Sequence, residues 1–246
     1  LVRSKELGIT HERGSFVPTK SCLQNAFGIT GPMWFQNLVM RGAYVASTVI
    51  IAPLGAISIA ANTFAITAES FCYMPGYGMA DAATTLVGQS LGAKRKDLSR
   101  SFARICTTLG VAMMSVLAVV MYFIAPQIMS LLSNDPDVVA LGAKVLRIEA
   151  FAEAGYAASI VAYGVFVGAG DTMVPSILNL GSTWLVRIVP AIFLTKIYGL
   201  TGYWIVMCIE LNVRGLVFLL RLHGDSWTKK MGNISTENGP AVAATT

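Results

Sequence analysis

A single long stretch, residues 57–96, limits what this chain can fold into more than any other part of it. Its apolar part is longer than the roughly 20 residues that a helix needs to cross a bilayer, and it ends in a basic cluster. Glu69 and Asp81 lie in or beside this apolar part, where a charge is costly unless it faces protein or water. Pro75 removes a backbone hydrogen bond between them and Gly76 permits close packing, which predicts a helix break. This combination favours a transporter over a passive membrane anchor.

The composition of the whole chain also indicates a membrane protein. It is 54% hydrophobic and 13% charged, whereas an average soluble domain is about 25% charged. Long continuous apolar runs, rather than alternating ones, predict helices and not a β-barrel. The net charge of +5 is spread between the apolar runs. Since charges there set membrane topology, we expect no nucleic-acid partner.

Turn and breaker residues divide the chain into a basic lead-in, six apolar runs and a polar tail. We expect an all-α, polytopic membrane fold with a six-helix transmembrane lobe at 32–222. Residues 1–31 are predicted to form a cytoplasmic lead-in with a short interfacial helix, and residues 223–246 a disordered cytoplasmic tail. The predicted spans are 32–52, 57–88, 102–124, 138–166, 173–195 and 201–220.

The distribution of basic residues predicts the orientation of these spans. Basic side chains gather in the lead-in, in the 94–100 loop and after the last run, whereas the 126–137 loop carries only acids. An even number of spans places both termini on one side, and the positive-inside rule places that side in the cytoplasm. Tyr198, Tyr203 and Trp204 are then expected to form an aromatic belt at the outer interface.

No pattern in the chain predicts a metal site, an organic cofactor or a catalytic site. The cysteines form no C-x-x-C pair, and His11 and His223 are isolated outside the apolar runs. No Ser-His-Asp or Cys-His arrangement supports catalysis, so we expect a protein that is not an enzyme. The four cysteines, read as buried small apolar residues, are Cys22, Cys72, Cys106 and Cys208.

Two acids in the fourth run are candidates for ion coupling. At a spacing of four residues, Glu149 and Glu153 share one face of a continuous helix. Two carboxylates so placed in a low-dielectric region are not both comfortably ionised, which is the property that a proton carrier needs. The alternative is that one of them pairs with Arg147 or Arg187 and only fixes helix packing.

A second candidate site lies in the first half of the 57–96 stretch. Glu69 shares a helical face with Asn62 and Tyr73, and these three groups could bind a cation or a proton. The alternative is a hydrogen-bonded knot between helices with no ligand. Asp81 lies nearer the basic loop, where it could bind an ion or pair with a Lys or Arg at the inner mouth.

The last two runs carry three further charges. Glu210 and Arg214 are four residues apart with the acid first, which favours a structural pair within one helix. Arg187 lies well inside the fifth run and requires a partner. An acid on a neighbouring helix is the natural partner.

Read together, several segments resemble the multidrug and toxic compound extrusion (MATE) transporter family, in its C-terminal six-helix lobe. The resemblance covers about residues 30–222. The segments that carry it are Ile59 to Asn62, Met74 to Gly78, Ala83 to Ala93, Glu153 with Tyr156 to Ser159, Gly168 to Thr172 with Pro175 and Ser176, Trp184 with Arg187, Glu210 with Leu211, and Arg214 with Gly215.

The resemblance implies two six-helix lobes around a central cleft, with alternating access driven by sodium or proton entry. It implies a small organic substrate, membrane lipid around the chain, an inner-membrane location and an N-terminal six-helix lobe of the same gene product as partner. Many relatives carry an acid after the first proline of this lobe, where this chain has Gln36, Met40 and Arg41, and many have Glu-Pro where this chain has Glu153 and Ala154. Substrate or cleft candidates are Asn62, Tyr73, Gln36, Arg41 and Arg187.

The leading hypothesis is an antiporter that exports amphipathic or cationic organic compounds in exchange for sodium or protons. A flippase for lipid-linked precursors, from the same broad superfamily, is the alternative, and its cavity should be strongly basic. A membrane scaffold without transport would not need intramembrane acids, each of which costs about 2.5–3.5 kcal/mol at a helix centre.

Overall fold

The computed structural model describes residues 20–224 and residue 227 of the chain. Residues 1–19 of the predicted lead-in and nearly all of the predicted disordered tail lie outside this part. The described elements are α1 (Lys20–Ile51), η1 (Ala52–Leu54), α2 (Ala56–Gly92), α3 (Lys96–Leu132), α4 (Pro136–Glu149), α5 (Glu153–Gly168), α6 (Met173–Gly181), η2 (Ser182–Ile188) and α7 (Val189–His223). The expected all-α fold is confirmed for the described residues.

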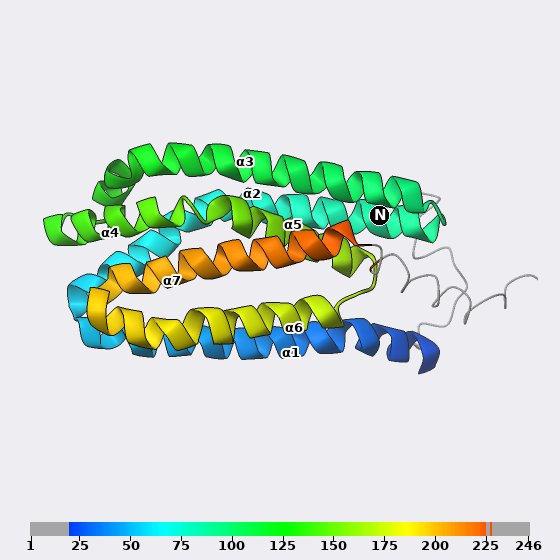
Figure 1. Ribbon diagram of the computed structural model, residues 1–246, viewed down its shortest axis with the longest axis horizontal. Helices are drawn as coiled ribbons and strands as arrows, with labels where there is room; N and C mark the ends of the chain where they lie inside the picture. Colours follow the sequence, from blue (N-terminus) through cyan, green and yellow to red (C-terminus); the bar gives the residue numbers. More distant parts are fainter. Residues whose placement is uncertain (1–19, 225–226, 228–246) are drawn as a thin grey trace, which may run out of the picture.

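Long helices run side by side along the molecule and reverse direction at its two ends (Figure 1). One end of the bundle holds the start of α1, the α2–α3 and α5–α6 connections and the end of α7. The α1–α2 and α3–α4 connections and the turn within α7 lie at the opposite end, whereas the α4–α5 junction lies between the two ends. α2 packs against α3, α4 and α5, whereas α1 packs against α6, η2 and α7. The described part therefore begins and ends at the same end of the bundle, as an even number of crossings requires.

Local sequence signals explain where several of these reversals occur. Gly55 adopts a φ of 91° between η1 and α2, a conformation that glycine reaches without a side-chain clash. The Asp135 carboxylate caps α4 by accepting a hydrogen bond from the Asp137 backbone N–H at 2.9 Å, and Pro136 occupies the first turn. Gly199 adopts φ 61° and ψ −145°, which breaks α7 into two helical portions. The predicted fifth and sixth runs are therefore separate helices joined by this turn.

Three helix boundaries differ from the sequence-based expectation. α1 begins at Lys20, well before the expected start of the first span at residue 32. The expected fourth helix is two helices, α4 and α5, which are bent by 58°. The expected fifth helix contains a π-helical segment, η2, between α6 and the first portion of α7.

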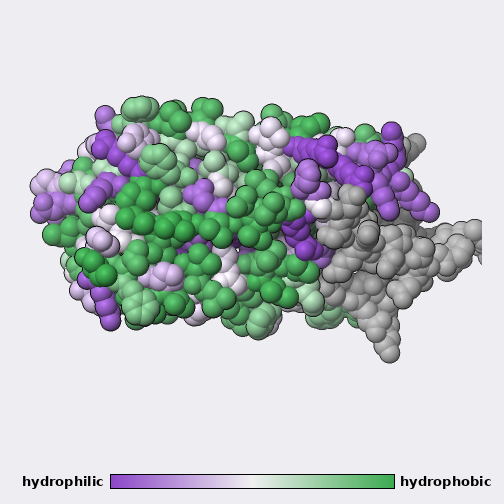
Figure 2. Space-filling view, viewed as in Figure 1, coloured by the Kyte–Doolittle hydropathy of each residue, from purple (hydrophilic) through white to green (hydrophobic). Residues whose placement is uncertain are grey.

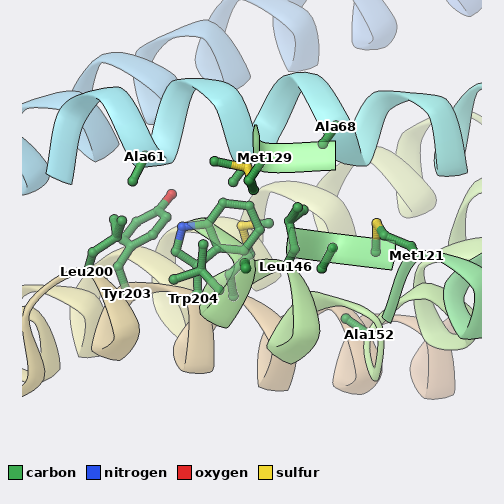
Figure 3. Packing of buried hydrophobic residues seen from close by; sticks show 14 of the residues in the cluster. Ala61, Ala68, Met121, Met129, Leu146, Ala152, Leu200, Tyr203 and Trp204 are labelled. Atoms are coloured by element: carbon green, nitrogen blue, oxygen red, sulfur yellow. The ribbon is translucent and has the colours of Figure 1, made fainter. Parts of the chain in front are cut away.

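The buried core is rich in small and medium apolar side chains that let the helices approach closely. Figure 3 shows one cluster, in which α2 faces Met129, Leu146 and the aromatic side chains of α7. Tyr203 is 5% exposed and Trp204 is fully buried. The prediction that they belong to an interfacial aromatic belt is therefore wrong, and only Tyr198, at 63% exposure, lies on the surface. Trp204 is buried because its Nε1–H finds an acceptor inside the bundle.

The outer surface has the pattern of a protein surrounded by lipid. On the face shown in Figure 2, apolar side chains cover the middle of the bundle and polar ones gather at both ends. By length and composition, two described helical segments could cross a membrane, 34–54 and 96–132, and α4 with α5 would together make a third. α2 and α7 do not meet this criterion; α2 carries acidic side chains in its apolar part, and α7 carries both acidic and basic ones.

Candidate functional site

A buried ion-pair network joins the last two spans. Glu210 on α7 is fully buried, and its carboxylate accepts hydrogen bonds from Arg187 Nη2 at 2.6 Å and from Ser182 Oγ at 2.5 Å. Arg214 Nε lies 3.2 Å from the same carboxylate, one helical turn along α7. The predicted intrahelical pair of Glu210 and Arg214 is confirmed, and the predicted acidic partner of Arg187 is Glu210. The Glu210 carboxylate is therefore paired with two guanidinium groups.

Two other buried carboxylates lie where α4 meets α5. Glu149 ends α4 and Glu153 begins α5, and both are fully buried. None of their four carboxylate oxygens has a hydrogen-bond partner in the described part of the chain. The expectation that they share one face of a continuous helix is wrong, because residues 150–152 interrupt the helix between them. The interruption instead turns both acids into the interior from two separate helix ends.

Glu69 on α2 is the third carboxylate of this buried region, at 5% exposure. It lies within electrostatic reach of Arg187 and of Glu153, and Glu149 lies within reach of both other acids. Together with Glu210, Arg187 and Arg214, these three acids make a group of four glutamates and two arginines. When all six are ionised, their formal net charge is −4 + 2 = −2. We call Glu69, Glu149 and Glu153 the acid cluster. Burying this excess of negative charge is unfavourable unless a cation or protons offset it.

The other polar groups proposed to act with Glu69 have partners of their own. The Oδ1 atom of Asn62 accepts a hydrogen bond from Trp204 Nε1 at 3.1 Å. Tyr73 packs edge-on against the rings of Tyr77 and Tyr156, each at a centroid separation of 5.8 Å. Asn62 therefore acts as a link between helices, which is one of the two alternatives that the sequence left open for it.

Three further candidates lie away from the acid cluster. Gln36 on α1 accepts a hydrogen bond from the hydroxyl of Tyr163 on α5, at 3.0 Å. Arg41 and Asp81 are both exposed side chains. No described basic side chain forms an ion pair with Asp81, and the expected pairing at the inner mouth is not observed. The structure therefore brings Glu69, Glu149, Glu153 and Arg187 into one region but not Asp81.

The predicted helix break at Pro75 and Gly76 is wrong, because α2 continues unbroken through both residues. A proline inside a helix removes one backbone hydrogen bond, which kinks a helix without ending it when tertiary packing holds both sides. A methyl group at Gly76 would meet the sulfur of Met114, which lies near the end of a flexible side chain that can shift to make room. The real discontinuity near the carboxylates is the α4–α5 junction.

Two features of this region have no signal in the sequence. Ser182, which binds Glu210, lies in an ordinary apolar run, and only the fold brings it to the carboxylate. Tyr156 on α5 lies beneath the guanidinium of Arg214, whose central carbon is 5.7 Å from the ring centroid. An aromatic face attracts a cation, so this ring helps to hold Arg214 beside Glu210.

Comparison with known proteins gives a consistent result. The MatE family model matches residues 32–193. Proteins named "Probable multidrug resistance protein NorM" are 25% identical over 221 residues in Thermotoga maritima and 29% identical over 176 residues in Halalkalibacterium halodurans. These alignments cover 89% and 71% of this chain but only 48% and 38% of the relatives. The chain thus spans about half the length of the curated relatives it matches, or less.

Solved structures show the same fold. The MATE transporter VcmN of Vibrio cholerae in its bent form superposes with a TM-score of 0.80 at 17% identity, over 93% of this chain and 50% of that chain. A MOP superfamily transporter from Pyrococcus furiosus superposes with a TM-score of 0.76 at 16% identity, over 80% of this chain and 44% of that chain. At sequence identities of 16–17%, these superpositions show that the fold is shared.

Proposed function

Because the chain belongs to the MatE family of multidrug and toxic compound extrusion transporters, we propose that it forms one six-helix lobe of a cation-coupled exporter. The proposed substrates are amphipathic or cationic organic molecules, exchanged for sodium or protons across the inner membrane. The observation that supports coupling most directly is the acid cluster, which buries three carboxylates and leaves both oxygens of Glu149 and of Glu153 without a partner in the described chain.

The acid cluster has the chemistry of a reversible cation site. Carboxylate oxygens bind sodium or protons, and a discontinuous membrane helix brings backbone carbonyls close to such a site. The cluster lies at the α4–α5 junction, where residues 150–152 leave the helix. A monovalent cation bound there would offset part of the net −2 of the buried region, and its departure would restore the repulsion among Glu69, Glu149 and Glu153.

A second lobe is the proposed partner of this one. The curated relatives are about twice as long as the segment that this chain matches, and large apolar side chains such as Trp34, Phe35 and Phe71 are exposed at 56–75%. Part of this surface would face lipid and part would close a central cleft against the second lobe. We infer that residues 1–246 transport only when paired with such a lobe.

The balance of buried charge favours this function over the flippase alternative. A cavity for polyanionic lipid precursors should be strongly basic, whereas the buried region here has four carboxylates and two guanidinium groups. Both arginines are already bound to Glu210. An acidic interior suits a cationic substrate or a coupling cation.

The test is dye efflux by the complete transporter that carries this lobe, under separate sodium and proton gradients. We expect Glu69→Gln or Glu153→Gln to keep expression near normal and to reduce gradient-driven efflux at least about tenfold, which corresponds to roughly 1.4 kcal/mol. Glutamine keeps the size and much of the hydrogen bonding, so the change isolates charge from packing.

Asp81→Asn is the matched control, because it makes the same chemical change on α2 at an exposed position outside the acid cluster. It should leave gradient-driven efflux unchanged. Normal efflux by both Glu69→Gln and Glu153→Gln, at normal expression, would exclude both of these carboxylates as the coupling site.

A further inference from the structure

The π-helical segment η2 brings two residues of the fifth span to the same carboxylate. Ser182 and Arg187 are five residues apart, and both bind Glu210. In an α-helix of 3.6 residues per turn, residues five apart point about 140° away from each other. In a π-helical turn, with its i→i+5 hydrogen bonds, they lie nearly one above the other. The π geometry is therefore what allows Ser182 and Arg187 to reach Glu210 together.

The pairing of charges in this region is uneven. Glu210 has two guanidinium partners, whereas the oxygens of Glu149 have no hydrogen-bond partner in the described chain. Arg214 is held on the same regular helix as Glu210, so it stays beside this carboxylate. Arg187 belongs to a different helix and also lies within electrostatic reach of Glu69 and Glu149. Of the two arginines, Arg187 is the one that can change partners.

We propose that Arg187 is an exchangeable countercharge, bound to Glu210 while a coupling cation occupies the acid cluster and moved toward that cluster when the cation leaves. The return of η2 from π-helical to α-helical geometry would separate Arg187 from Ser182 and release it. Glu210 keeps Arg214 as partner during the exchange, and Arg187 then offsets part of the negative charge that the departing cation leaves in the acid cluster. Arg187 is thus a positioning residue for the ion, and this role rests on the proposed coupling function.

Arg187 is enclosed by titratable groups from several elements. Glu69 and Glu149 attract it toward the acid cluster, whereas Glu210 and the Ser182 hydroxyl hold the arrangement seen here. Two phenolic side chains complete its surroundings. The titratable and charged groups around it are Tyr44 on α1, Glu69 on α2, Glu149 on α4, and Tyr203, Glu210 and Arg214 on α7.

Two substitutions should shift the cation dependence of efflux in opposite directions. Ser182→Ala removes a hydrogen bond that holds the Glu210-bound state, so Arg187 competes more strongly with the cation. We expect the half-saturating sodium or proton concentration to rise about fivefold, the effect of one ordinary hydrogen bond on an equilibrium. Arg187→Gln removes the competitor, so the half-saturating concentration should fall, while slow cation release lowers the maximal rate.

The controls are Ser130→Ala and Arg147→Gln, which make the same chemical changes at exposed positions of α3 and α4. Ser130 bonds only to the backbone of its own helix turn, and Arg147 is an exposed side chain over Tyr122. Neither control should shift the half-saturating concentration. Shifts of Ser182→Ala and Arg187→Gln in the same direction, or no shift in either, would overturn the exchange.

A second measurement tests the exchange without transport. Backbone hydrogen–deuterium exchange in residues 182–188 of the complete transporter is compared in sodium chloride and in choline chloride at alkaline pH, and then at acid and alkaline pH without sodium, with every rate expressed as a protection factor that removes the intrinsic pH dependence of amide exchange. We expect the added cation to slow amide exchange in η2, and Glu149→Gln to reduce that response. Identical exchange in all conditions would refute the proposal. A normal response with uncoupled efflux would refute the coupling function alone.

Discussion

A close contact between two helix backbones gives a sharp prediction for Gly164→Ala. Gly164 on α5 faces the backbone of Ala80 on α2, and a methyl group built on it would lie 2.9 Å from the Ala80 carbonyl carbon. Ordinary contact begins at 3.4 Å, so α2 and α5 would have to separate by at least 3.4 − 2.9 = 0.5 Å. The obstacle is backbone, which no side-chain rotation can move aside.

The cost follows from what this separation disturbs. The hydroxyl of Thr84 on α2 donates a hydrogen bond to the Gly164 carbonyl oxygen at 2.8 Å, and the separation stretches it. A radial gap of about 0.5–1 Å already forfeits roughly a quarter to a half of each dispersion contact. Overpacking costs about 1–3 kcal/mol and the weakened hydrogen bond about 1 kcal/mol more. We therefore expect a loss of about 2–4 kcal/mol in stability, the sum of these two terms.

The assay is denaturant or thermal unfolding of the complete transporter in detergent, with Gly92→Ala as the control. Gly92 ends α2, and a methyl group there would meet no atom within 4 Å. Its substitution should change the stability by less than about 0.5 kcal/mol. If Gly164→Ala unfolds at the same midpoint as Gly92→Ala, the close backbone contact between α2 and α5 is not present and the reasoning fails.

Three further measurements follow. Glu210→Gln leaves Arg187 and Arg214 without a counterion, so the unfolding midpoint should fall by the equivalent of about 3–5 kcal/mol; retention of the wild-type midpoint would contradict the network. Trp204→Phe leaves the buried Asn62 carbonyl oxygen without its donor and should cost about 1–3 kcal/mol in the same assay; an unchanged midpoint would argue against the link. In a cysteine-free background, a cysteine at exposed Ser101 should resist an impermeant maleimide in intact cells while one at Asn134 reacts; the reverse labelling would overturn the orientation. Ser99 is unsuitable for this purpose because it is fully buried.

The helical architecture was largely predictable because its determinants are local. Apolar runs of spanning length and glycine or proline signals such as Asp135-Pro136 and Gly199 depend on neighbouring residues alone. The need of Arg187 for an acid also followed from the cost of a lone intramembrane charge. That this acid is Glu210 could not be predicted, because the pairing depends on which helices become neighbours in the fold.

The errors arose where tertiary packing overrode a local rule. Glu149 and Glu153 were placed on one helix face because no breaker separates them, yet the chain leaves the helix at Ala150, Phe151 and Ala152. Trp204 matched the rule for interfacial aromatics, but a hydrogen-bond acceptor across the bundle made its burial favourable. The π-helical turn of η2 has no sequence signal at all, because two side chains that bind a distant carboxylate stabilise it.

The abrupt turn at Gly199 has a consequence for how this lobe enters the membrane. The first portion of α7 and the portion after Gly199 are joined without an intervening loop, and a methyl group at Gly202 would collide with the backbone of Leu194. The fifth and sixth spans thus form a tight helical hairpin. We expect them to leave the translocon together, with Arg187 and Glu210 already paired. Neither charge would then cross into lipid alone, which would cost about 2.5–3.5 kcal/mol at a helix centre.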